Sequence, residues 1–181
     1  MTSRLVGIFP ILIVLACAGE TGPGGGVASD AAADISAESL PGREEFVQNG
    51  LISPGTDRAS FTEALGQPDS ASAEIIPNRH IPDAQDSIIT IYYPRVIATV
   101  HRPGPGGELL KSVQVSDNQF LRYPVIGAAS EVIATAFGEP DEQTINTVTY
   151  FCTSCTAGNN PVRFSFEDGR VRSVRFSYYV D

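Results

Sequence analysis

The amino-acid sequence predicts an α+β fold made of two tandem repeats, each a short helix packed on an antiparallel sheet of three to four strands, after a disordered tether. Three observations lead to this prediction. A six-residue motif occurs twice, strand-like segments rich in β-branched and aromatic residues follow each copy, and a stretch rich in glycine, alanine and serine precedes both. A helix followed by a run of strands, rather than alternating with them, is typical of the α+β class.

The repeated motif closes a short helix in each half. It reads Ala-Leu-Gly-Gln-Pro-Asp at 64–69 and Ala-Phe-Gly-Glu-Pro-Asp at 136–141. Apolar residues with helical spacing precede each glycine, namely Phe61, Ala64 and Leu65 and then Ile133, Ala136 and Phe137. This spacing places one apolar stripe on each helix. Because a glycine with a proline two residues later ends a helix, we expect left-handed stops at Gly66 and Gly138.

Strand-like segments follow each helix. Residues 87–93 and 147–151 are rich in isoleucine, threonine, valine and tyrosine, which favour strands. In the second half, Asp168-Gly169 separates two alternating apolar segments, 162–166 and 174–178. Asp-Gly between such segments is a strong signal for a β-hairpin.

The first repeat is longer than the second. Asp69 and Ser112 are 43 residues apart, and their counterparts Asp141 and Ser173 are 32 apart, so the first repeat carries about eleven extra residues. We place them in 75–85 and in the glycine turn that follows the strand at 96–100.

The N-terminus has the pattern of an export signal. Arg4 precedes an apolar segment, 5–15, which as a helix would be about 17 Å long. That length suits a signal peptide and is too short to cross a hydrocarbon core of about 30 Å. Val-Leu-Ala-Cys at 14–17 resembles the lipobox of bacterial lipoproteins. The resemblance implies cleavage before Cys17, a diacylglyceryl group on its sulfur and an acylated new N-terminus.

A second interpretation of the leader stays open. Ala16-Cys17-Ala18 also fits simple secretory cleavage, which would leave Gly19 as the first residue. We favour lipidation because a cysteine at this position is otherwise hard to explain, and several acyl chains make the attachment effectively permanent. Because Ala18 is not an aspartate, the enteric sorting rule implies the outer membrane, with the protein facing the periplasm.

A tether separates this anchor from the folded part. Residues 18–41 show no apolar periodicity and include Gly-Pro-Gly-Gly-Gly at 22–26, so they predict a flexible linker. A short helical lead-in is expected at 44–50. The predicted divisions of the chain are a signal peptide at 1–16, the lipidated cysteine and tether at 17–50, and repeats at 51–122 and 123–181.

Charge and composition limit the partners. The formal net charge is −9, and no basic stripe interrupts it. An acidic chain repels phosphate backbones, so we expect no nucleic-acid partner. With 42% hydrophobic and 18% charged residues, the chain has the composition of an ordinary globular protein with a packed core.

The repeated unit resembles a known family. A helix ending in Leu/Phe-Gly-x-Pro-Asp, followed by a strand and a hairpin with Phe-x-Asp-Gly, is similar to the BamE/SmpA lipoproteins, which assist the machine that inserts outer-membrane β-barrels. The doubled unit is similar to the secreted β-lactamase inhibitory proteins. The resemblance covers 55–117 and 127–181 and implies fold, but it carries over no binding residue. The Gly-Met-Thr opening usual in the BamE family is replaced by Gly-Ala-Ala at 127–129.

The remaining cysteines offer limited chemistry. Cys152 and Cys155 precede a turn-rich loop, and outside the cytoplasm such a pair is most simply a disulfide. A redox pair or a free dithiol stays open, although a redox motif needs a helix after its first cysteine. Zinc would need two more ligands, whereas His80 and His101 lie in the other half and are expected to be solvated. We therefore expect no metal and no small-molecule cofactor.

One surface is a candidate for binding a partner. Arg163 and Arg175 are predicted to face away from the core, with Ser177 and Tyr179 on the same side. Arginine and tyrosine are favoured anchors in protein interfaces. A merely solvated sheet face is the alternative.

These observations favour a non-enzymatic, lipid-anchored envelope lipoprotein that binds another envelope protein or assists assembly. Its partners would be the membrane, through the N-terminal lipid, and that protein. One alternative is a secreted or surface-attached protein that binds and inhibits an enzyme. A further alternative is an envelope thiol-redox protein that uses Cys152 and Cys155.

Overall fold

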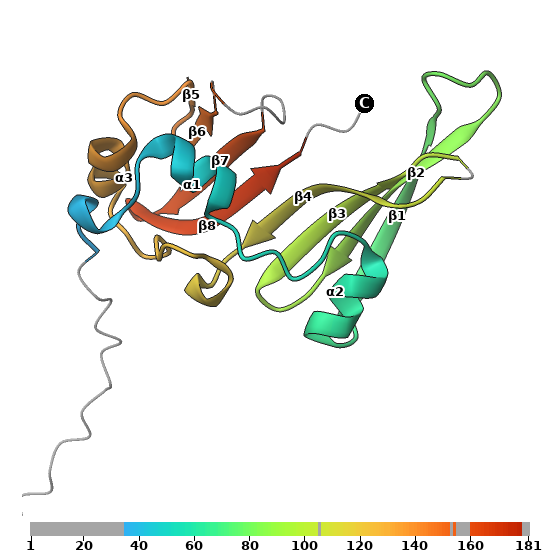
Figure 1. The fold of residues 1–181 in the computed structure, drawn as a ribbon, viewed down its shortest axis with the longest axis horizontal. Helices are drawn as coiled ribbons and strands as arrows, with labels where there is room; N and C mark the ends of the chain where they lie inside the picture. The colour runs from blue at the N-terminus through green and yellow to red at the C-terminus, as the bar shows by residue number, and fades with distance from the viewer. Residues whose placement is uncertain (1–34, 105, 153, 155–159, 179–181) are drawn as a thin grey trace, which may run out of the picture. The chain divides into compact units, whose positions relative to one another are not determined.

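The computed structural model describes residues 35–104, 106–152, 154 and 160–178. Within them, one antiparallel sheet carries α-helices on one face (Figure 1). The helices are α1 (Arg43–Asn49), α2 (Arg58–Leu65) and α3 (Ser130–Phe137), with short 3-10 helices η1 (Ala37–Ser39) and η2 (Asn118–Phe120). The strands are β1 (Ser70–Pro77), β2 (Gln85–Tyr92), β3 (Val96–Arg102), β4 (Leu109–Val115), β5 (Glu142–Gln143), β6 (Thr147–Phe151), β7 (Pro161–Glu167) and β8 (Arg170–Ser177).

The strand order joins two groups of four strands into one sheet. It runs β1-β2-β3-β4-β8-β7-β6-β5. Helix α2 precedes the first group in the sequence and α3 precedes the second. The groups meet where β4 pairs antiparallel with β8, from Ser112 opposite Ser177 to Val115 opposite Val174. The predicted α+β class is therefore confirmed, and the sheet is continuous across both halves.

Both predicted helices form and end at the predicted glycines. Gly66 has φ 82° and ψ −163°, and Gly138 has φ 76° and ψ −157°. The positive φ agrees with the expectation of a glycine stop, but ψ is extended rather than left-handed helical, so the chain turns directly into a strand. Helix α2 starts at a capping box in which the Asp57 carboxylate accepts a hydrogen bond from the Ser60 backbone N–H at 2.8 Å.

The hairpin predicted in the second half is confirmed. Strands β7 and β8 are joined by Asp168 and Gly169, both with positive φ (51° and 73°). Two such residues in a row suit the tight turns that match the twist of the paired strands.

Part of the extra length of the first half lies where we predicted it, in 75–85, which comprises the end of β1, the connection at 78–84 and the start of β2. All eight residues of β1 pair with β2 in a continuous register. The corresponding strand of the second half, β5, has only two residues. The insertion thus lengthens a hairpin, and β1 is a full edge strand that the sequence prediction missed.

Helix α1 corrects the predicted extent of the tether. The lead-in expected at 44–50 is a helix, and Phe46 on it is fully buried. Its ring lies 5.2 Å from that of Phe137, 5.5 Å from that of Phe164 and 5.9 Å from that of Phe176, measured between centroids. The tether predicted over 17–50 therefore ends before α1, because this segment is part of the core. None of the helices among the described residues is long and apolar enough to cross a membrane.

Candidate functional site

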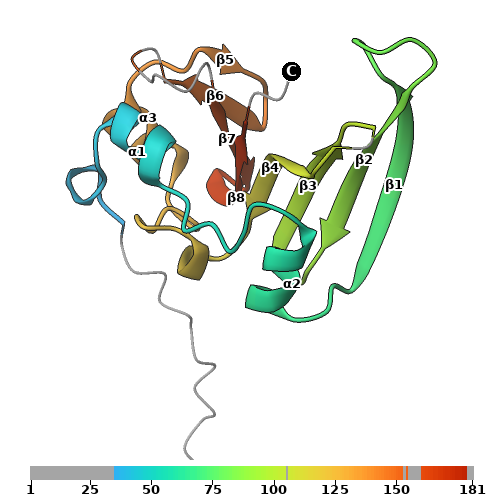
Figure 2. The same cartoon turned by 45° about the vertical axis from the view of Figure 1, so that its right-hand side comes forward.

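The sheet has one covered face and one open face. Directly opposite residues in neighbouring antiparallel strands share a face, so the register shows which side chains lie together. One row of the covered face runs through Ile91, Ala98, Val113, Phe176, Val162 and Tyr150, all of them buried. The α-helices lie on this side (Figure 2), and their buried residues belong to the same hydrophobic cluster.

The open face carries a mixed row of polar, aromatic and basic side chains. From β2 to β6 the register partners are Tyr92, Ile97, Gln114, Arg175, Arg163 and Thr149. A neighbouring row consists of hydroxyl side chains only: Thr90, Thr99, Ser112 and Ser177. Thr99 and Ser112 are each 7% exposed. Hydroxyl groups thus fill the spaces between longer side chains, and the long side chains form the outer surface of this face.

Arg163 and Arg175 are direct register partners on β7 and β8. Arg163 donates a hydrogen bond from Nε to Thr149 Oγ1 at 3.2 Å and lies 3.7 Å from a carboxylate oxygen of Glu142. Arg175 makes no hydrogen bond or ion pair with any described residue, and its Nε is buried. Two like charges therefore lie side by side, and one of them has no counter-ion among the described residues.

The alternation of residues in the sequence located this surface correctly. Arg163, Arg175 and Ser177 lie on the face opposite to the core, as predicted, with Ser177 half-buried. Tyr179 lies outside the described residues. Reasoning from the sequence missed Gln114 and Tyr92, because they belong to the other half and join the row of Arg175 only through the β4–β8 pairing.

The two histidines differ from each other. His80 is exposed, as expected, but His101 is not solvated, which corrects the prediction. Its Nε2 lies 3.0 Å from Oδ2 of Asp86, and the two side chains are only 12% and 7% exposed. Asp86 also accepts hydrogen bonds from the side chain of Asn78 at 2.7 Å and from the backbone N–H of Gly104 at 3.0 Å.

This polar cluster lowers the pKa of the Asp86 carboxyl group. The hydrogen bond from Asn78, assisted by those from His101 and Gly104, holds the pKa of Asp86 below its ordinary value, although burial opposes the shift. A hollow of about 130 Å³ beside the cluster is also lined by His80 and Lys111. Because three donors already occupy the carboxylate, we interpret Asp86 as a residue that fixes the ends of the hairpins.

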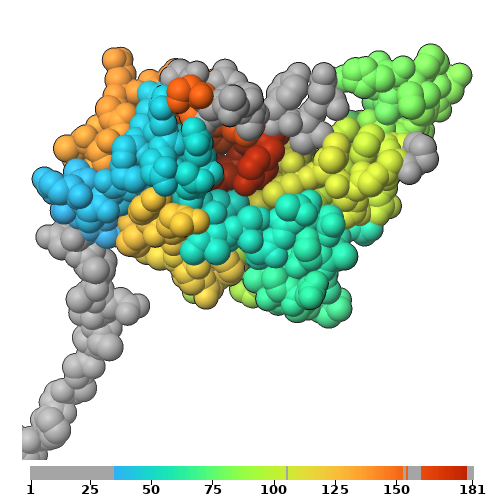
Figure 3. Space-filling view, viewed as in Figure 1, coloured from blue at the N-terminus to red at the C-terminus, as the bar shows by residue number. Residues whose placement is uncertain are grey.

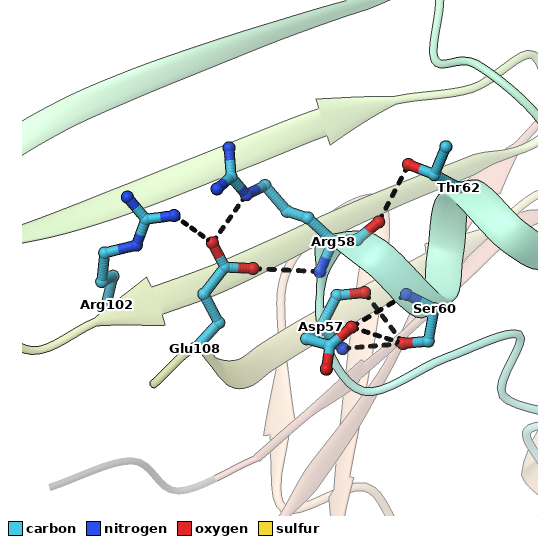
Figure 4. Close-up of polar contacts among 6 residues, drawn as sticks. All are labelled: Asp57, Arg58, Ser60, Thr62, Arg102 and Glu108. Carbon is cyan, nitrogen blue, oxygen red and sulfur yellow. Dashed lines mark hydrogen bonds and ion pairs between the residues drawn. The ribbon is translucent and has the colours of Figure 1, made fainter. Parts of the chain in front are cut away.

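A second polar cluster fixes α2 to the β3–β4 hairpin (Figure 4). Glu108 accepts hydrogen bonds from the side chain of Arg58 at 2.6 Å, from that of Arg102 at 2.5 Å and from the Arg58 backbone N–H at 3.0 Å. Burial alone would raise the pKa of Glu108. The hydrogen bonds from Arg58 and Arg102 lower it by more, so the pKa lies below its ordinary value. The arrangement stabilises the start of a helix and leaves the carboxylate no free oxygen for a ligand.

Two further hollows each lie between one helix and neighbouring strands. One, of about 380 Å³, is lined by residues of α1 and β8, and Figure 3 shows red β8 at the bottom of a recess beside the cyan α1. The other, of about 340 Å³, lies between α3 and the β5–β6 hairpin. The described lining residues of both include no histidine or cysteine. In the described part of the chain, no group of three or more His, Cys, Asp or Glu residues is arranged to hold a metal ion.

Cys152 is 2% exposed and disulfide-bonded. Its predicted partner, Cys155, lies outside the described residues, so the pairing itself stays a prediction. A buried sulfur is poorly accessible to attack by another thiolate.

No protein-family model, curated protein or solved structure matches this chain. The resemblance to the BamE/SmpA lipoproteins and to the β-lactamase inhibitory proteins therefore stays a prediction from the sequence.

Proposed function

We propose that this chain is a non-enzymatic binding module that docks a protein partner on the open face of its sheet. The observation that carries the proposal is the row from Tyr92 to Arg163, in which an aromatic ring, an amide and two guanidinium groups share one face. Tyrosine and arginine are the side chains most enriched among interface anchors. Because the helices lie on the opposite side, a partner could reach this row without displacing any of them.

We further propose that lipid on Cys17 anchors the module to the outer membrane, facing the periplasm. The lipobox-like residues at 14–17 support this, as does the glycine-rich stretch between them and α1. Mass spectrometry of the mature protein tests it. The expected N-terminal peptide begins with Cys17 and carries acyl chains, whereas an unmodified chain beginning at Gly19 would replace the anchor with free secretion.

The two halves are proposed to be copies of one unit. Each has a helix, a glycine of nearly equal φ and ψ, and four strands in the same order. The Asp69 backbone N–H donates to the carbonyl of Tyr92 at 2.9 Å, and that of Asp141 donates to the carbonyl of Thr149 at 3.0 Å, so each motif aspartate extends the pairing of the strand that follows it. These correspondences support duplication followed by pairing of the two units along β4 and β8.

The enzyme-inhibitor alternative uses the same face, so it differs only in the partner. The thiol-redox alternative draws no support from the surroundings of Cys152, because that residue is almost completely buried.

Photo-crosslinking in cells tests the docking face. A photoreactive amino acid at Tyr92, which is 37% exposed on the open face, is expected to give a discrete crosslinked protein. The same amino acid at Glu63, exposed on α2 on the other side, serves as the matched control and is expected to give none.

Equal crosslinks from both positions, or none from Tyr92 and its neighbour Ile97, would refute docking on this face. The identity of the crosslinked protein then separates the two binding functions, since an assembly component supports one and a secreted enzyme supports the other.

A further inference from the structure

We infer that the partner inserts an acidic side chain, aspartate or glutamate, whose carboxylate binds between Arg163 and Arg175. This inference rests on the proposed docking function and deepens it by naming the chemistry of the partner. The anchor lies at the middle of the open face, where β7 and β8 pair.

The first argument is electrostatic. Like charges directly opposite on neighbouring strands destabilise a sheet, and Arg163 and Arg175 are in that relation. Glu142 offsets only Arg163, and loosely, at 3.7 Å with both side chains more than half exposed. No acidic side chain among the described residues reaches Arg175. Within the described part of the chain, the positive charge at this point is therefore uncompensated, although the full sequence has a net charge of −9.

The second argument is the unsatisfied donor. The Nε of Arg175 is buried, and no described group accepts its hydrogen bond. Gln114, the register partner on the other side, turns its amide nitrogen toward Ser173 at 3.4 Å instead. Buried donors are almost always paired in folded proteins, and an exception calls for an explanation. Arg175 as a whole is partly exposed, so a partner's carboxylate would reach the terminal guanidinium nitrogens first and could accept from the buried Nε only after the side chain shifts.

A carboxylate fits better than other anions. Its two oxygens can accept from the planar fork of one guanidinium, or bridge two of them, with a single negative charge. Because the rest of the chain is acidic, multiply charged anions are repelled more strongly than a single carboxylate. Ile97 and Tyr92 lie in the same row, two and three strands from Arg175, and offer apolar and aromatic contact beside the charged pair. This combination suits an acidic residue flanked by apolar ones on a protein surface.

The first test needs no identified partner. Acetate is added to the mature lipoprotein in detergent micelles, and the Arg Nε–H resonances are followed by NMR, with chloride at equal ionic strength as reference. We expect a saturable shift of the Arg175 resonance with acetate only, and no such shift at Arg172, which lies on the same strand and pairs with Glu167 at 3.3 Å. An Arg175 resonance that responds alike to acetate and chloride would overturn the inference.

The second test separates the anchor from the docking face. Crosslinking from position 92 is repeated in an R163Q/R175Q variant and in an R172Q control, after thermal unfolding has shown that both fold. We expect the yield to fall about tenfold or more in the double variant only, as for a central anchor. An unchanged yield would leave docking intact and reject the carboxylate anchor. Absence of crosslinks in the unsubstituted protein would instead reject docking itself.

The stability of the R175Q variant gives an independent check. A residue that serves binding contributes nothing to the free fold, so its replacement is expected to leave the melting temperature unchanged or to raise it. A clear fall would assign Arg175 to folding and contradict the inference.

Discussion

At the scale of single residues, several described carboxylates stabilise the fold by accepting hydrogen bonds. Glu108 is the clearest case, because two guanidinium groups and a helix N-terminal amide converge on it (Figure 4). Hydrogen bonds to charged groups stabilise proteins more than neutral ones, by about 1.5–3 kcal/mol each when they are well shielded. Since Glu108 is mostly shielded and Arg58 partly exposed, the cluster falls at the lower end of that range.

We expect Glu108→Gln to lower the free energy of unfolding at pH 7 by about 1–2 kcal/mol. The folded-state pKa of Glu108 is lowered, so its contribution is present above the unfolded pKa of about 4.3 and is lost as the pH falls through the folded value. The difference between the two proteins should therefore shrink below about pH 4. Urea unfolding measured across this pH range checks it.

The control is Glu131→Gln on α3, because the exposed Glu131 side chain makes no hydrogen bond or ion pair with described residues. It should change stability by less than about 0.5 kcal/mol. Equal losses in both variants would mean that general charge, rather than the Arg58–Glu108–Arg102 cluster, produces the effect.

The positions of some of these residues could be predicted from the sequence, and those of others could not. Arg163 and Arg175 could be assigned to the open face because strand residues alternate between faces. The Asp86–His101 pair could not be foreseen, since the two residues lie 15 apart on different strands and meet only in one register. The position of Gln114 beside Arg175 could not be predicted for the same reason, because no local pattern indicates which strand of the other half pairs with β4.

At the scale of elements, the two helix stops depend on glycine. Gly138 has φ 76° with an extended ψ, a combination that essentially only glycine adopts. The space around it is open, and a Cβ would meet nothing within 4 Å. Any cost of substitution there is therefore conformational rather than steric.

We expect Gly138→Ala to lower the free energy of unfolding by about 1–3 kcal/mol. Gly107 offers a matched control, because it also has open space but no positive φ. Gly107→Ala should be neutral or stabilising by up to about 1 kcal/mol, through the lower entropy of the unfolded chain. Thermal unfolding of the two variants checks this pair, and a neutral Gly138→Ala would contradict the argument.

Some strands could be predicted from the sequence, and others, such as β1, could not. Those with β-branched or aromatic residues alternating with polar ones were found, because burial of one face leaves that pattern in the sequence. Strand β1 reads Ser-Ala-Ser-Ala-Glu-Ile-Ile-Pro and is exposed along nearly its whole length. Because this edge strand buries few side chains, its sequence lacks the alternation of apolar and polar residues that marks other strands. Only its pairing with β2 identifies it as a strand.

At the scale of the whole molecule, α1 unites segments that are far apart in sequence. Phe46 contacts aromatic rings from α3, β7 and β8. Arg43, one turn earlier, donates to the carbonyl of Phe151 at 2.9 Å and forms an ion pair with Asp141. The N-terminal helix therefore belongs to the second half of the sheet in space, although the first half follows it in the chain.

We expect Phe46→Ala to lower the free energy of unfolding by about 3–5 kcal/mol, because it leaves a cavity at the centre of the aromatic cluster. Ile52→Ala, at a residue that is 50% exposed, should cost less than about 1 kcal/mol. Denaturant unfolding checks both. A small effect at Phe46 would show that α1 packs too loosely to be part of the core.

The way in which the halves combine could not be predicted from the sequence. Each half has two edge strands, and the residues of β4 and β8 are as apolar as those of other strands. Their pairing depends on how α1 and the segment around η2 place the second half, through contacts that no single stretch of sequence encodes. The helix-plus-strands pattern was local and could therefore be predicted.

The strand order also sets when the molecule can fold. Strand β8 lies between β4 and β7, yet it is the last strand of the described chain to be synthesised. The hydrogen bond from Arg43 to the carbonyl of Phe151 joins residues that are 108 positions apart in the sequence. Contacts between residues so far apart in the sequence form slowly, and they cannot form until both segments have been synthesised. The edge of β4 therefore stays unpaired until β8 has been synthesised, and the pairing of β8 with β4 and β7 then completes the sheet.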